Sequence, residues 1–204
     1  MASKLTQLAR QKTASELQTM GRDAYRWLTK KISSLSNPTG IASTIAREDR
    51  GNHFYNGGLY FFYYDPKTKA DLPYYDRYPL VIPFDTTRLG GRAAGTSTQP
   101  GFMGLNMHYL PLRLRARLMD ALYTVISDEN YDDRTHLQVS YKLLKSVTKY
   151  HMYKPCIKQY LFSHVRTRYF RIDPKSWDIA LFMPLDRFVG ANRESVYRDS
   201  YNKL

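Results

Sequence analysis

Three short runs of aromatic and β-branched residues constrain the fold more than any other feature of the chain. They read "GLYFFYY" from Gly58, "YPLVIPF" from Tyr78 and "GFMGLNMHYL" from Gly101, and each is bounded by Gly, Pro or Asp. Runs of this length and composition are typical of strands rather than of helices. We therefore expect a small antiparallel sheet, or a partly open SH3-like barrel, between about residues 54 and 110.

The connections between these runs carry signals of their own. An Asp-Pro pair at residues 65–66 opens the first connection with a turn, whereas residues 85–100 form a long Gly- and Thr-rich loop. The stretch "YYDRYPLVIP", residues 74–83, leads into the second run. We expect its tyrosines to pack beside that strand. Asp76 and Arg77 are expected to fix the turn through an ion pair or through a hydrogen bond from the backbone to the aspartate.

The second half of the chain is expected to be mainly helical. Pro111 suits the first position of a helix whose apolar residues recur every three or four positions, and Asn192 suits the cap of a last short helix. Another helix is expected near residues 143–149, whereas "SWDIALFMP", residues 176–184, has the composition of a buried strand. A further helix is expected to begin at Pro155, with Ile157, Leu161, His164 and Val165 facing inward.

The N-terminal segment differs from the rest of the chain. Residues 3–30 space their apolar side chains as an amphipathic helix does, and residues 33–58 have the Ser-, Asn-, Thr- and Gly-rich composition of an extended connector. The expected fold class is therefore α+β, with packed helices and an N-terminal helical arm. The predicted division is an arm and linker at 1–53 and one α+β domain at 54–204, β-rich over 54–110 and mainly helical over 111–204.

The charge of the chain favours a polyanionic partner. Its 204 residues carry a formal net charge of +13, and most of this charge lies on the two flanks of a nearly neutral middle. Such an excess favours association with polyanions such as nucleic acid or an anionic membrane. A single cysteine, Cys156, is present, and no run of about 18 apolar residues occurs. We therefore expect neither an internal disulfide nor a membrane partner.

Most catalytic chemistry lacks a matching pattern in this sequence. There is no Gly-rich phosphate loop with its lysine and no Cys or His pair at zinc-site spacing. His108 lies in an apolar run, which favours a hydrogen-bonded core histidine, and Cys156 has no recognisable His and acid pair, which favours a structural thiol. We expect no catalytic residue, no metal and no cofactor, and a nuclease remains a distant alternative. The aspartates that a two-metal nuclease could use are Asp65, Asp71, Asp76 and Asp85. Asp65 and Asp85 look more like turn residues, and Asp76 is expected to fix the turn beside Arg77.

Basic residues of the second half are the candidate DNA contacts. Arg113, Arg115 and Arg117 lie in the first turns of their helix, where the helix dipole disfavours cations. A duplex phosphate there would bind both the free amides and the guanidinium groups, whereas solvation or pairing with nearby aspartates is the alternative. Lysines interleaved with tyrosines and a second arginine cluster, at the end of the helix expected from Pro155, add further candidates. The predicted set is Arg113, Arg115, Arg117, Lys142, Lys145, Lys149, Lys158, Arg166, Arg168 and Arg171.

The chain also resembles a known family. The strings "FFYYDPKTKADLPYYDRYPLVIPFD", "GFMGLNMHYLPLRLRARLMDALY", "YKPCIKQYLFSHVRTRYFRID" and "WDIALFMPLDRFVGANRESVYRDS" resemble the DNA end protector, or DNA terminus, family of T-even-type tailed phages and their cyanophage relatives. The resemblance covers residues 58–204, without the loop at 86–100. It implies a virion protein that binds the ends of packaged double-stranded DNA and shields them from host exonuclease. It implies a binder rather than an enzyme and supplies no catalytic residues.

A second interpretation stays open beside this one. A neck, tail or baseplate component of the virion would turn its positive surface toward acidic protein partners. The long arm and the loop at 86–100 suit wrapping around such neighbours. Under both interpretations we expect other virion proteins as partners, and a location in the virion, with the host cytoplasm during assembly.

Overall fold

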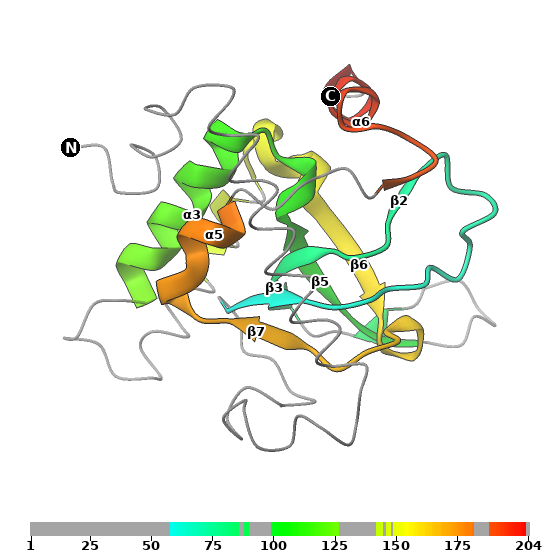
Figure 1. Cartoon of the computed structure of the whole chain (residues 1–204), viewed down its shortest axis with the longest axis horizontal. Helices are drawn as coiled ribbons and strands as arrows, with labels where there is room; N and C mark the ends of the chain where they lie inside the picture. The colour runs from blue at the N-terminus through cyan, green and yellow to red at the C-terminus, as the bar shows by residue number, and fades with distance from the viewer. Residues whose placement is uncertain are drawn as a thin grey trace.

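The computed structural model describes residues 58–85, 88–89, 99–126, 142–144, 146–147, 149–181 and 188–202. Within these residues the chain forms an antiparallel sheet with helices packed against it (Figure 1), which confirms the expected α+β class. The N-terminal arm, its linker and most of the loop at 86–100 lie outside the described residues. The division of the chain at residue 54 therefore stays a prediction.

Six strands form the main sheet: β1 (Leu59–Phe61), β3 (Leu80–Asp85), β4 (Arg88–Leu89), β5 (Gln99–Asn106), β6 (Ile157–Leu161) and β7 (Phe170–Ile172). β4 continues the side of β3 along β5, because the register runs on from Asp85 opposite Met103 to Arg88 opposite Pro100. The order across the sheet is therefore β6, β5, β3, β1, β7, with antiparallel pairs throughout. Among the described strands β6 and β7 do not pair with each other, so the sheet is open rather than a closed barrel.

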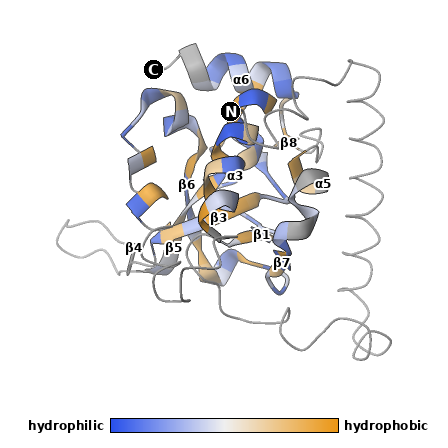
Figure 2. Cartoon of the chain, turned by 90° about the vertical axis from the view of Figure 1, so that its left-hand side faces the viewer, coloured by the Kyte–Doolittle hydropathy of each residue, from blue (hydrophilic) through white to orange (hydrophobic). Residues whose placement is uncertain are grey.

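Helices and one short strand pair surround this sheet. The α-helices are α3 (Leu112–Ile126), α5 (Trp177–Leu181) and α6 (Arg193–Asn202), and the strand pair is β2 (Tyr75–Asp76) with β8 (Phe188–Val189). The 3₁₀ helices are η2 (Met107–Tyr109), η3 (His151–Cys156), η4 (Phe162–His164) and η5 (Pro174–Ser176). α3 and α5 lie side by side, whereas α6 contacts η2 and η3 (Figure 1). Figure 2 shows hydrophobic residues gathered on the strands and a largely hydrophilic α6.

The central strand β3 is apolar at successive positions because both of its faces are covered. Leu80, Val81 and Ile82 are all fully buried. Leu80 and Ile82 face the main core, which β3 forms with α3 and α5, whereas Val81 faces an aromatic cluster on the opposite side. A strand covered on both faces needs apolar side chains at successive positions. The aromatic cluster comprises Tyr60, Phe62, Tyr64, Val81, Phe102, Tyr160 and Tyr169.

Phe62 is the centre of the aromatic cluster. Its ring makes edge contacts with four others, at centroid distances of 5.3 Å to Tyr169, 5.5 Å to Tyr160, 6.0 Å to Phe102 and 6.4 Å to Tyr64. Edge-to-face ring pairs are favourable by about 0.5–1.5 kcal/mol beyond their buried area. The cluster therefore holds β1, β5 and β6 together on the side of the sheet away from α3.

The helix expected from Pro155 is absent, and this prediction is wrong. Pro155 lies inside η3, and the chain then forms β6, which pairs with β5 from Ile157 opposite Leu105 to Leu161 opposite Gly101. A short apolar segment fits a helix or a strand equally well by spacing alone, and the open edge of β5 decides between them because it supplies backbone partners. The arginines beyond β6 accordingly lie in a loop and in β7 rather than at a helix end.

The buried strand expected at residues 176–184 is wrong as well. Trp177–Leu181 form α5, which follows the turn of η5. Trp177, Ala180 and Leu181 are buried, and their spacing of three and four positions is that of a helix packed on a core. The late strand of the sheet is β7 instead.

Other helix boundaries agree with the sequence. α3 begins at Leu112, directly after Pro111, and its buried residues Leu118 and Leu122 face the main core. Asn192 caps α6, because its Oδ1 accepts a hydrogen bond of 2.8 Å from the Ser195 amide. Helical turns at 142–144 and 146–147 overlap the helix expected near residues 143–149.

We expect Phe62→Ala to lower the free energy of unfolding by about 3–5 kcal/mol, because it removes a buried ring and leaves a cavity. Leu72→Ala is the control, since Leu72 is 41% exposed and should change stability little. Urea denaturation followed by circular dichroism measures both variants. Equal midpoints for the two variants would contradict the role given to Phe62.

Candidate nucleic-acid interface

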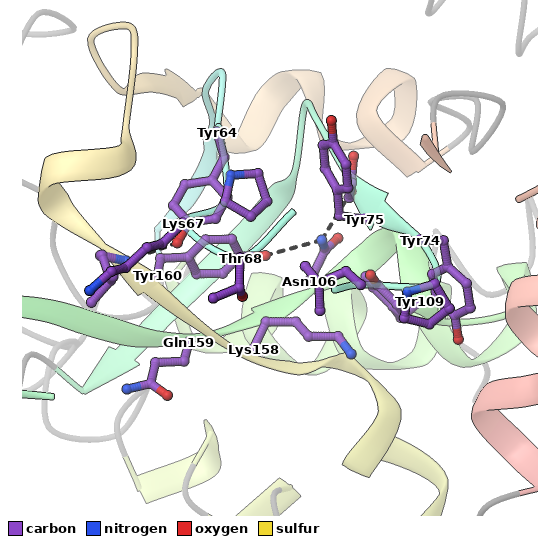
Figure 3. Close-up of a pocket in the computed structure, with 15 residues that line it drawn as sticks. Tyr64, Lys67, Thr68, Tyr74, Tyr75, Asn106, Tyr109, Lys158, Gln159 and Tyr160 are labelled. Carbon is purple, nitrogen blue, oxygen red and sulfur yellow. Dashed lines mark hydrogen bonds between the residues drawn. The ribbon is translucent and has the colours of Figure 1, made fainter. Parts of the chain in front are cut away.

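A buried hydrogen-bond network around Asp76 lies beneath the candidate site. The Asp76 Oδ2 accepts from Asn106 Nδ2 at 3.0 Å and lies 2.8 Å from His108 Nδ1, while its Oδ1 accepts from the Tyr78 amide at 3.1 Å. Asn106 Nδ2 also donates to the Tyr160 hydroxyl at 3.1 Å, as Figure 3 shows. The network therefore ties β2, β5, η2 and β6 to one carboxylate.

This network settles two expectations from the sequence. The bond from the Tyr78 amide confirms that Asp76 fixes the turn through the backbone. The side chain that lies against its carboxylate is His108 rather than Arg77, which bonds the Tyr75 side chain instead. His108 is the hydrogen-bonded core histidine that was expected, with a side chain only 5% exposed. The side chains of Asp76 and His108 are both almost fully buried, and their contact holds β2 against η2.

A pocket of about 480 Å³ opens above the network. Residues 64–75 form one side of it, and β6 with the end of β5 and η2 forms the other. Figure 3 shows Tyr64 and Tyr160 toward one end of the pocket and Tyr74 and Tyr109 toward the other, with Asn106 between them. The lining residues with polar or aromatic side chains are Tyr64, Lys67, Thr68, Tyr74, Tyr75, Asp76, Asn106, Tyr109, Lys158, Gln159 and Tyr160.

Lys158 gives this pocket a positive charge. Its Nζ lies 3.9 Å from the centroid of the Tyr109 ring, a cation–π contact. No carboxylate lies within ion-pair distance of Lys158 among the described residues. Burial lowers the pKa of the Lys158 ammonium, so the charge is incompletely stabilised where it stands. An anion at the pocket would supply the missing stabilisation.

The metal-ligating side chains and the cysteine of the described residues are placed as follows. Among the described residues, no three His, Cys, Asp or Glu side chains gather as metal ligands. Cys156 is buried, its Sγ donates to the Tyr153 carbonyl at 2.9 Å, and burial raises the pKa of its thiol to about 12. The buried, hydrogen-bonded thiol agrees with the structural role that the sequence favoured.

A comparison of the sequence with protein families identifies the family of this chain. A sequence model of the family described as the phage T4 terminal DNA protecting protein matches residues 4–203. The chain belongs to this family. It is a DNA end protector of the phage virion, as the resemblance in the sequence implied. The match extends into the N-terminal arm and across the loop at 86–100, which the quoted strings do not cover.

Further comparisons add nothing to this assignment. A search of curated proteins and a search of solved structures both returned no match. In the described part of this end protector, no helix is long and apolar enough to span a bilayer.

The structure corrects the prediction that Arg115 of this end protector contacts DNA. Its side chain is buried, at 2% exposure, and its Nη1 and Nη2 donate to the carbonyls of Leu181 and Leu110 at 2.8 and 3.4 Å. Arg115 also bonds the Tyr197 side chain, whose hydroxyl donates to the Leu110 carbonyl at 3.0 Å. The guanidinium therefore joins α3 to α5 and α6, and a phosphate cannot reach it.

The remaining predicted contacts differ in their exposure and in their partners. Arg113 and Arg117 are exposed one turn apart on α3, and Arg117 lies close enough to Tyr153 of η3 for its charge to oppose the burial that raises the pKa of that tyrosine. Arg166 is tied to Asp65 at 3.4 Å. Lys142, Lys149, Arg168 and Arg171 are exposed, Lys158 lines the pocket, and Lys145 lies outside the described residues.

The sequence analysis did not predict the pocket. Lys67, Tyr74 and Tyr109 were not among the predicted contacts, yet all three line it. The available signal was the excess of tyrosine, 18 residues in the chain, together with the cluster "YYDRY" at residues 74–78. Tyr74 and Tyr78 do pack beside the core, as expected, and both Tyr74 and Tyr75 line the pocket.

Asp76→Ala should lower the free energy of unfolding by about 2–5 kcal/mol, because it leaves the Asn106 amide and His108 Nδ1 buried without their acceptor. Asp71→Ala is the matched control, since Asp71 is exposed. Thermal melts at pH 7 compare the two proteins. A variant at position 76 that melts with the control would show that the network contributes nothing to stability.

Arg115→Ala and Arg113→Ala should separate structure from DNA contact. The first should cost about 2–4 kcal/mol of stability, because buried carbonyls lose their donor, while the folded protein keeps its affinity for duplex. The second should leave the melting temperature unchanged and weaken duplex binding. Melting curves and fluorescence anisotropy at low salt measure these effects, and the reverse pattern would refute the assignment of Arg115.

Proposed function

We propose that exposed cations on α3 and on the segment before η3 hold the phosphates of the duplex end. The residues are Arg113, Arg117, Lys142 and Lys149. None of the four has an ion-pair partner among the described residues, so their charges are available to an external anion. Membership of the family supplies the DNA terminus as the ligand, and these unpaired charges are the observation that carries the proposal.

Phosphate contacts of this kind are independent of base sequence. Each neutralised phosphate releases bound counterions, so the logarithm of the binding constant falls linearly with the logarithm of the salt concentration. Four contacts correspond to a slope of about −3.6 on duplex DNA. The protein would then exclude an exonuclease by occupying the terminal phosphates rather than by changing them.

We further propose that the chain is a binder and not an enzyme. The Asp76–His108 pair is buried and bound into the network of β2, β5 and η2, and the described residues include no metal-ligand cluster. Within the same proposal, other virion proteins are partners, and the chain occupies the host cytoplasm before it enters the particle. The net charge of +13 suits acidic partners as well as DNA.

The test is a protection assay on the full chain. Linear duplex and a nicked circle of the same sequence are incubated with the protein, and a processive exonuclease is then added in magnesium buffer. We expect the linear DNA to survive and the nicked circle to be degraded. The double variant Arg113→Ala, Arg117→Ala should protect poorly, whereas Arg198→Ala, which removes an exposed arginine of α6 that is paired with Asp199, should protect normally.

Two outcomes would overturn the proposal. The first is an absence of binding to linear duplex at low salt. The second is cutting of the DNA by the protein itself in the presence of metal, which would make the chain a nuclease. Protection that survives loss of both arginines would move the phosphate contacts to another surface.

A further inference from the structure

We propose that the pocket between residues 64–75 and β6 binds the terminal nucleotide of a strand that has unpaired from the duplex end. The base would stack on the tyrosines, and the phosphate would lie at Lys158. The inference rests on the proposed function and adds what that function lacks. Phosphates are alike along the whole duplex, so the α3 cations alone cannot distinguish an end from the interior.

The rings of the pocket have the exposure that stacking requires. Tyr74 and Tyr75 are half-buried and leave ring surface open to the pocket, whereas Tyr64, Tyr109 and Tyr160 are nearly buried. The buried rings are held in place by their neighbours: Tyr64 meets Tyr160 edge-on at 4.9 Å, and Tyr109 meets Phe188 in the same way at 4.9 Å. The pocket therefore has a rigid aromatic floor with two accessible rings beside it.

The size of the pocket selects one nucleotide. A volume of about 480 Å³ lies within the range of about 300–1,000 Å³ typical of small-molecule sites. A single base with its sugar and phosphate is a ligand of this class. A stacked base pair is not, so a nucleotide must leave the helix to enter.

The charge of the pocket favours a phosphate. Lys158 stands over Tyr109 without a carboxylate partner among the described residues, and Lys67 lies exposed on the facing segment (Figure 3). The one acid in the lining, Asp76, has both carboxylate oxygens engaged, by the Tyr78 amide, Asn106 and His108. Its oxygens are thereby occupied by donors of the protein, and the cations that line the pocket are Lys67 and Lys158.

The polar groups of the floor leave little capacity to read a base. Asn106 Nδ2 donates to Asp76 and Tyr160, and its Oδ1 accepts from the His108 amide at 2.9 Å. Thr68 and Gln159 are exposed at the rim. Ring faces accept any base, so binding here is independent of sequence.

End selectivity follows from the cost of extrusion. Taking a nucleotide out of a duplex requires unpairing and unstacking, and this cost is smallest where the base is already frayed. A terminal nucleotide has a stacking neighbour on one side only. A pocket for one extruded nucleotide therefore favours termini over interior positions.

The test measures end preference, defined as the ratio of the dissociation constant for a covalently closed duplex circle to that for its linear form. Lys158→Gln and Tyr74→Ala should each lower this ratio about tenfold, because a charge-assisted contact or a stacking contact is lost only at the end. Arg113→Ala, as the comparison, should weaken both forms equally and leave the ratio unchanged. Melting curves accompany each variant, and Lys158→Met serves if Tyr74→Ala fails to fold.

A second measurement locates the nucleotide directly. Linear duplex carrying 5-iodouracil at the 3′-terminal position, or ten positions inward, is irradiated with the full-length protein, and crosslinked peptides are identified by mass spectrometry. We expect the terminal probe to crosslink to the peptide that contains Tyr74 and Tyr75, and the internal probe to crosslink elsewhere. Terminal crosslinks confined to other peptides, or an unchanged ratio in folded pocket variants, would overturn the inference.

These outcomes separate the two proposals. Exonuclease protection by the wild type together with an unaltered end preference in the Lys158 and Tyr74 variants would refute the pocket alone. Crosslinking to the pocket without exonuclease protection would refute the proposed shielding and leave the nucleotide site standing.

Discussion

One buried carboxylate holds the functional half of this molecule together. Asp76 bonds the turn before β3, the end of β5 and η2, and through Asn106 it reaches Tyr160 on β6. Burying a carboxylate is costly unless its oxygens are engaged, and here each oxygen has a partner. Tyr160 connects this network to the rest of the fold, because the same ring packs in the aromatic cluster and lines the pocket. The pocket is thus as rigid as the sheet beneath it.

Tyrosine suits this arrangement because one side chain supplies both an apolar face and a polar tip. In the aromatic cluster the tyrosine rings pack as core, whereas at the pocket Tyr74 and Tyr75 are only half-buried. The two proposed DNA-binding sites have different roles. Cations on α3 provide affinity for any duplex, whereas the pocket, which admits one nucleotide, provides the preference for an end.

Much of the β-rich half could be predicted, since its strands are short apolar runs closed by Gly and Pro, and the caps of α3 and α6 could be read from Pro111 and Asn192. The segments after Pro155 and around Trp177 could not, because each is too short for periodicity to separate helix from strand. Their structure depends on the free edge of β5 and on the core beneath α5. The prediction for Arg115 was wrong for another reason. Arg115 lies three and seven positions before Leu118 and Leu122, on the buried face of α3, whereas Arg113 and Arg117 lie one turn apart on the exposed face. The spacing indicated the buried face, and the structure adds the carbonyls of α5 and of residue 110 that accept from the guanidinium.

The sequence by itself determined the α+β class, the strand runs, the positive charge and the family. Composition, the positions of Gly and Pro, and motif strings are all local properties of the chain. Only the tertiary structure decided which charges face solvent and which residues meet across the pocket. Lys67 and Lys158 are 91 positions apart in the sequence and line the same pocket, and Asp76 and Asn106 are 30 apart and share a hydrogen bond. The pairing of β5 with β3 and β6 brings these segments to one region. A site assembled from such distant segments is set by strand pairing and side-chain packing, which no local pattern encodes.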